Sequence, residues 1–172
     1  MSTVSVSAGW FINDRWTARA AAGAILDGEL IPADGTVHDV EQGGLASVGM
    51  EYRALVGEGT VPFVDVSLFL GMSWTETIAP GATIKQDYFA ADARLGARGS
   101  WNIGDNFFPS VALRVFGGPV QWALEGEDVT GSDIHHYQIA LGAAAQVGSV
   151  GIFAEWAPLG ERGFSAGLST AW

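Results

Sequence analysis

Residues of alternating polarity run through most of this chain, and this two-residue period limits how it can fold more than any other feature. In segment 88–101 the odd-numbered residues carry no charge, whereas the even-numbered residues include Asp92, Arg94 and Arg98. Helical periodicity is hard to find. Because successive side chains of a β-strand point to opposite faces, the pattern predicts an all-β protein whose strands face two different environments.

The connections between the strand-like segments alternate in kind. Tight turns such as INDR (12–15) and GS (148–149) are rich in residues that tolerate positive φ. The connections 27–42, 76–87 and the stretch around 125–133 are long and acidic. Alternating short turns and long loops are typical of an up-and-down antiparallel barrel in an outer membrane. The nine segments that we interpret as strands are 3–11, 16–26, 44–55, 61–75, 88–101, 107–118, 134–147, 150–157 and 163–172.

Charges inside these segments all fall on one of the two faces. An arginine that faces lipid at the bilayer midplane costs about 2–4 kcal/mol, so a membrane explains why the other face carries no charge. The charged face is otherwise rich in Gly, Ala and Ser, which fit the crowded inside of a narrow barrel, and the apolar face carries Trp, Leu, Val and Met. The charged strand residues are Arg19, Glu51, Arg53, Asp65, Asp92, Arg94, Arg98, Arg114 and Glu155.

A soluble ligand-binding barrel of lipocalin type is the alternative to a membrane barrel. Such a barrel has its apolar face inside and its polar face outside. It also needs a charged exterior to remain in solution, and one or two charges per strand give thin cover. Charged residues make up only 16% of the chain, against roughly 25% in an average globular protein. The composition therefore favours a transmembrane barrel.

The charges of the predicted lumen nearly balance. Five arginines and four acids lie in the strands, which therefore carry a charge of +1, and the turns and loops carry −12, for a net charge of −11. Unpaired charges are costly in a narrow interior, so we expect salt bridges that fill the barrel. The alternative is a narrow, selective path in which the arginines set a preference for anions.

Tryptophans gather at the ends of the predicted strands. Trp10, Trp16, Trp101 and Trp172 flank short turns or the end of the sequence, and Trp74 and Trp122 lie toward the long loops. Two belts of aromatic residues match the preference of Trp and Tyr for membrane interfaces. The alternative is that they are ordinary core aromatics.

Three stretches resemble opacity-type and OmpA-like outer-membrane barrels. They are GWFINDRWTARAAAG (9–23), VPFVDVSLFLGMSW (61–74) and GFSAGLSTAW (163–172). The last is similar to the signal that such proteins present to the barrel assembly machinery, although Trp172 replaces the more usual Phe and Thr170 is a weaker match. The resemblance implies one transmembrane barrel domain over 1–172, located in the bacterial outer membrane as a monomer among lipid and lipopolysaccharide.

The number of strands is open at this point. Bacterial single-chain barrels generally have an even number of strands with both termini in the periplasm. Nine segments do not satisfy this, so we expect eight strands, with ten as the alternative. The first residues, MSTVSVSAGW, lack the basic and apolar regions of a secretory signal, so export requires that a signal has been removed.

Catalytic, metal and nucleic-acid functions find little support in the sequence. The chain has no cysteine, which excludes disulfides, thiol catalysis and zinc–thiolate sites. Its acidic charge argues against nucleic acid. His135 and His136 are adjacent and point to opposite faces of a strand, His38 lies in a long loop, and Ser132 beside His135 lacks the motif of a lipid-modifying hydrolase. We expect no enzyme activity, no cofactor and no metal, and a structural or surface-interaction role.

Overall fold

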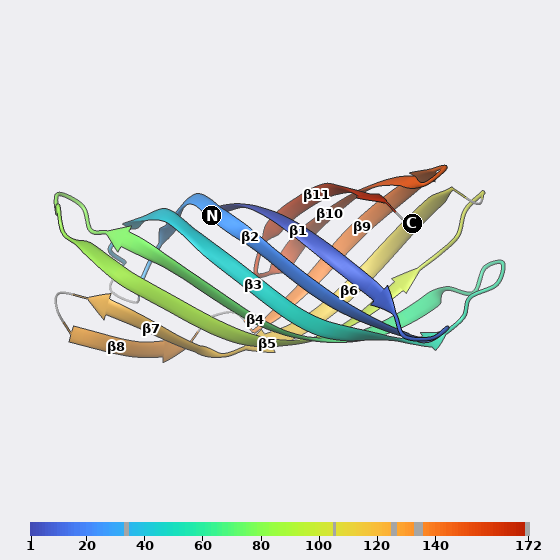
Figure 1. The fold of residues 1–172 in the computed structure, drawn as a ribbon, viewed down its shortest axis with the longest axis horizontal. Helices are drawn as coiled ribbons and strands as arrows, with labels where there is room; N and C mark the ends of the chain where they lie inside the picture. The colour runs from blue at the N-terminus through green and yellow to red at the C-terminus, as the bar shows by residue number, and fades with distance from the viewer. Residues whose placement is uncertain (33–34, 105, 125–126, 133–135, 171–172) are drawn as a thin grey trace.

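The protein is all β. The computed structural model describes residues 1–32, 35–104, 106–124, 127–132 and 136–170 (Figure 1). No helix in these ranges is long and apolar enough to cross a membrane. Within the described residues, eleven antiparallel strands form one sheet. They are β1 (Ser2–Phe11), β2 (Trp16–Leu30), β3 (His38–Leu55), β4 (Phe63–Ile78), β5 (Lys85–Ser100), β6 (Phe107–Gly117), β7 (Pro119–Leu124), β8 (Glu127–Ser132), β9 (Tyr137–Val147), β10 (Val150–Gly160) and β11 (Gly163–Thr170).

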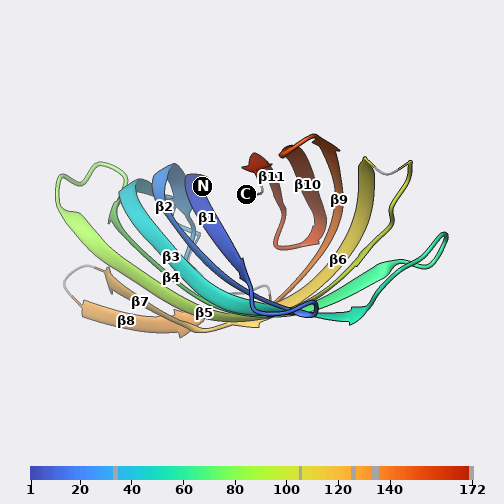
Figure 2. The same cartoon turned by 45° about the vertical axis from the view of Figure 1, so that its right-hand side comes forward.

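The sheet curls into a half-barrel (Figure 2). Its strands follow the order β1-β2-β3-β4-β5-β6-β9-β10-β11, so neighbours in space are neighbours in sequence apart from the β7–β8 hairpin. β1 and β11 flank the open side of the curl, and within the described ranges no backbone pairing joins them. The predicted antiparallel, up-and-down arrangement is confirmed, and the sheet is open along one side.

The strand number differs from the eight that we expected and from the alternative of ten. The nine segments read from the sequence match the nine strands of the continuous path. We expected eight strands because closed bacterial barrels generally have an even number. That rule does not apply to a sheet with two free edges. The remaining two strands, β7 and β8, lie off the path, in a region that the sequence indicated as loop.

Two consecutive glycines, the last residue of β6 and the one residue that follows it, lie at the junction with β7. β6 pairs with β5 from Ser100 to Ala93, and β7 pairs with the same strand from Ala90 to Tyr88. β6 and β7 therefore follow one another along β5, and the chain bends at Gly117 and Gly118 between them. A Cβ atom at Gly118 would overlap the carbonyl oxygen of Ala91, so this close passage requires glycine.

Much of the chain that we assigned to long loops is strand. β2 continues to Leu30 and β3 begins at His38, so only the tip of 27–42 is a connection. In the same way β4 reaches Ile78 and β5 begins at Lys85. Strands of 15 to 18 residues exceed the roughly 9–11 residues that cross a bilayer. The sheet therefore extends well beyond membrane thickness at the loop end.

The ladder between β4 and β5 fixes which side chains share a face. It runs from Phe63 opposite Ser100 to Ile78 opposite Lys85 without a shift in register. Directly opposite residues of paired strands lie on the same face. The ladders on either side continue these rows into β3 and β6. The faces assigned from sequence alternation can thus be followed across the sheet.

The junction between β6 and β7 gives a first prediction. Gly118→Ala places a methyl group against the backbone of β5, and relieving this overlap is expected to lower the free energy of unfolding by about 1–3 kcal/mol. Gly131→Ala in β8 is the matched control, because a Cβ there meets no atom within 4 Å. Urea unfolding followed by tryptophan fluorescence measures both, and an equal effect of the two substitutions would contradict the assigned close passage.

Candidate functional site

All nine charged residues that we singled out lie on one face of the sheet. Arg53 is opposite Asp65, which is opposite Arg98. A second row joins Glu51 through Ser67 and Gly96 to Arg114. The other four charged residues occupy positions of their strands that face the same side: Arg19, Asp92, Arg94 and Glu155. The β-ladder therefore gathers the charges before any ion pair is considered.

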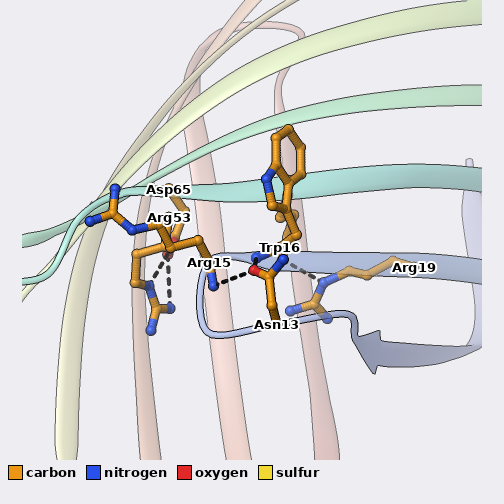
Figure 3. Close-up of polar contacts among 7 residues, drawn as sticks. Asn13, Arg15, Trp16, Arg19, Arg53 and Asp65 are labelled. Atoms are coloured by element: carbon orange, nitrogen blue, oxygen red, sulfur yellow. Dashed lines mark hydrogen bonds and ion pairs between the residues drawn. The ribbon is translucent and has the colours of Figure 1, made fainter.

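Two ion pairs link neighbouring strands at the short-turn end of this face. Arg19 of β2 donates from Nε to Glu51 Oε2 of β3 at 2.6 Å. Arg53 of β3 donates from Nε to Asp65 Oδ1 of β4 at 2.9 Å, with a longer contact of 3.4 Å from Nη2 to Oδ2 (Figure 3). Each pair crosslinks adjacent strands in the wall of the half-barrel.

The turn between β1 and β2 positions the first of these pairs. The Asn13 side-chain oxygen accepts hydrogen bonds from the backbone N–H groups of Arg15 and Trp16, at 2.9 and 3.0 Å (Figure 3). Such a turn, closed by an Asn side chain, is the reason Asn favours this position. It starts β2 at Trp16, whose ring lies 4.8 Å from that of Tyr52, and so sets the parity that carries Arg19.

Glu155 bridges strands that are not neighbours. Its Oε1 and Oε2 accept hydrogen bonds from Arg114 Nη1 and Nη2 at 2.6 and 2.7 Å, and Oε2 also accepts one from Arg98 Nη2 at 2.9 Å. Glu155 lies on β10, whereas Arg114 and Arg98 lie on β6 and β5. A contact across β9 requires that the charged face is concave.

A glycine on β9 leaves space for the Glu155 side chain to cross that strand. Gly142 is directly opposite Glu155, and a Cβ placed there would lie 3.7 Å from Glu155 Cγ and 2.7 Å from Ser110 Oγ. A larger residue would occupy the space through which the carboxylate reaches Arg114. Small residues thus admit long charged side chains to the concave face. Next to the bridge lies a buried cluster of alanines, Ala112, Ala140 and Ala157.

Asp92 and Arg94 form the fourth charged group. Arg94 Nη2 lies 3.6 Å from Asp92 Oδ2, and its guanidinium carbon lies 5.2 Å from the centre of the Phe116 ring. With this pair, the structure brings the nine residues into four ion-paired groups. Each arginine of the set faces a carboxylate, so the arrangement crosslinks the wall.

The opposite, convex face is apolar and exposed. Met50, Leu68, Leu95 and Val115 form one continuous row across β3, β4, β5 and β6, and each of these side chains is exposed. Leu70 on the same face is 56% exposed. Other exposed members of this face are Val4, Val6, Val48, Val66, Met72, Val111, Leu113, Leu141, Ile152, Trp156, Phe164 and Leu168.

The six tryptophans that we predicted for a membrane interface divide into four cases, of which Trp122 is the last. Trp10, Trp16 and Trp74 are exposed on the convex face. Trp101 is half-buried directly after β5. Trp172 lies outside the described residues.

Trp122 differs from the others, because it is buried on the concave face. Its indole Nε1 donates a hydrogen bond to Thr77 Oγ1 at 2.9 Å. Its ring lies edge-on to those of His38 and Tyr88, at 4.8 and 5.6 Å. His38, which the sequence predicts in a long loop, is the first residue of β3 and is buried. Trp122 therefore belongs to a small core at the loop end of the half-barrel, which the sequence interpretation missed.

Metal binding finds no candidate in the described ranges. No group of three or more His, Asp and Glu side chains lies close enough there to hold an ion. His38 packs in the loop-end core, and His135 lies outside the described residues. Comparison with protein-family models, with curated proteins and with solved structures finds no match for this chain.

The Glu155 bridge gives a second prediction. Glu155→Gln leaves Arg98 and Arg114 without their carboxylate. Glu155 and Arg114, whose side chains are 16% and 18% exposed, form the least exposed ion pair among the described residues. Loss of one partner of a largely buried pair is expected to lower the free energy of unfolding by about 3 kcal/mol.

Glu51→Gln is the control for this substitution, because Arg19 and Glu51 are more exposed and such pairs contribute at most about 1 kcal/mol. Urea unfolding of both variants measures the difference. Equal losses would show that Glu155 does not hold the concave face together.

Proposed function

We propose that this chain is a small β-barrel protein of the bacterial outer membrane, with a lumen filled by ion pairs and a structural or surface-interaction role. One observation carries the proposal: the exposed large apolar side chains at the centre of the sheet lie on the convex face, and the nine charges singled out from the sequence lie on the concave face. The charges of β4 and β5 that share the convex parity, Glu76, Lys85 and Asp87, lie at the loop end of these strands. In a bilayer this is the favourable arrangement, because the convex face of a barrel meets lipid.

The extent of the apolar face argues against the soluble alternative. A monomeric soluble protein seldom exposes apolar patches larger than a few hundred Å². Here the row through Met50, Leu68, Leu95 and Val115 has further apolar rows on both sides. A lipocalin-type barrel would place these residues inside.

The pairing of the lumen charges supports a filled interior. A selective path for anions uses arginines that are free to meet the ion. Arg98 and Arg114 instead share Glu155, and Arg19 and Arg53 each hold a carboxylate. We therefore favour a structural lumen over a narrow channel.

The loop end of the sheet supports a role at the cell surface. β7 and β8 form a hairpin beside the loop end of β5 (Figure 1), and β8 is exposed along its whole length. Its first residues, Glu127 and Asp128, are acidic. An acidic hairpin beyond the bilayer is accessible to lipopolysaccharide and to external partners.

The likeness of 163–172 to the assembly signal of outer-membrane barrels extends the proposal to biogenesis. β11 places Phe164, Ala166 and Leu168 on the convex face, where an insertion machinery can bind them. The proposal includes a monomeric state, and no catalysis or cofactor.

Detergent dependence and heat-modifiable gel mobility test the membrane assignment. Refolded into micelles or phospholipid vesicles, the protein is expected to migrate differently before and after boiling, because folded transmembrane barrels resist the gel detergent until heated. A protein that is monomeric in plain buffer, with the same mobility before and after boiling, would contradict the proposal.

Conductance across planar bilayers tests the filled lumen. We expect no discrete openings from the inserted protein, since ion pairs occupy the concave face. Reproducible unitary openings would contradict the filled lumen and favour a narrow channel. They would not contradict the membrane assignment.

A further inference from the structure

We infer that β1 and β11 pair with each other in parallel, within one chain, to close a nine-stranded barrel in the membrane. The inference rests on the proposed membrane location. β1 and β11 are the two edges of the path and flank its open side (Figure 2). In lipid, every backbone N–H and C=O needs a partner, so only closed sheets are stable there.

The topology fixes the direction of this pairing. Each strand on the path is antiparallel to the next, and the path contains nine strands. The first and the ninth strand therefore run the same way. Two copies in the same membrane orientation would also meet β1 to β11 in parallel. In a barrel with an even number of strands, the first and last strands pair antiparallel. β1 and β11 cannot pair in this way within one chain.

Neither edge strand has the features that prevent an edge from pairing with another strand. Free edges in native proteins are protected by charges, prolines or bulges. β1, STVSVSAGWF, and β11, GFSAGLST, contain no charge and no proline. The ladder of β1 shifts only at Ser2 and Thr3, and the ladder of β11 with β10 runs without a shift. Both edges are suited to pairing.

The side chains of the two edges match on both faces. On the concave face β1 presents Thr3, Ser5 and Ser7, and β11 presents Ser165 and Ser169. These are small, and their hydroxyl groups can hydrogen bond across a ladder. On the convex face Val6 and Leu168 are 80% and 78% exposed. Pairing would join them into one apolar band around the barrel.

The Glu155 bridge favours closure within one chain over pairing with a second copy. It links β10 to β5 across two intervening strands, β9 and β6, which requires a tightly curved wall. Barrels of about eight strands are narrow enough for side chains to fill, whereas those of about 16–18 strands leave an open channel. Two chains joined at both edges would form the wider kind, in which this contact is out of reach.

Cysteine crosslinking tests the seam, and the chain has no native cysteine to interfere. One cysteine replaces each concave residue of β1 in turn, and a second replaces each concave residue of β11. Oxidation of the protein in vesicles is read on denaturing gels. Gly151→Cys with Ser169→Cys is the positive control, because these residues are directly opposite in the β10–β11 ladder.

Parallel closure predicts crosslinks within single chains, at pairs with a constant difference between the two residue numbers. Pairs with a constant sum, which indicate antiparallel pairing, would overturn the inference, and so would crosslinks found only in dimers. No crosslink in protein that shows heat-modifiable mobility and forms the control crosslink would also overturn it, leaving the membrane assignment intact. Protein without heat-modifiable mobility would refute the membrane assignment, and the seam with it.

Discussion

The unbroken register between β4 and β5 is the constraint on which the rest of the structure depends. It holds Phe63 opposite Ser100 and Ile78 opposite Lys85, with every intermediate pair in step. A slip of one residue between two strands would turn every side chain of one of them to the other face. If β4 slipped, Asp65 would lie on the convex face and Leu68 on the concave face. The register places charged and apolar side chains on opposite faces. In turn, the cost of mixing them disfavours any other register.

Curvature follows from what lies on the concave face. Gly142 leaves room for Glu155 to cross β9, and the carboxylate holds Arg114 and Arg98 from two further strands. Long charged side chains among small residues thus link strands that are not neighbours across the concave face. At the centre of the sheet the convex face remains an exposed apolar surface, and an ion pair of that face, between Lys85 and Glu76, lies at the loop end.

The sequence predicted the strand centres well and their ends poorly. A strict two-residue period marks β4 and β5, whereas an extra residue in β3 between Val40 and Gly43 shifts the parity. His38 was therefore interpreted as loop, and the core around Trp122 was missed. The charges were placed on one face by parity alone, but the partner of Glu155 was out of reach of the sequence, because it depends on how far the sheet curls. The strand number was misjudged because the rule that such barrels have an even number of strands was applied to a path of nine strands.

Spin-label scanning along β4 tests most directly whether the convex face meets lipid. With no native cysteine, each variant from Val66 to Met72 carries a single nitroxide in protein reconstituted in vesicles. The account predicts high accessibility to oxygen and low accessibility to a water-soluble nickel complex at Leu68 and Leu70, alternating with low accessibility to oxygen at Ser67 and Phe69, which share the ion-paired face with Asp65. High accessibility to the nickel complex at Leu68 and Leu70 would show that these side chains face water, and it would contradict the proposal that the convex face meets lipid.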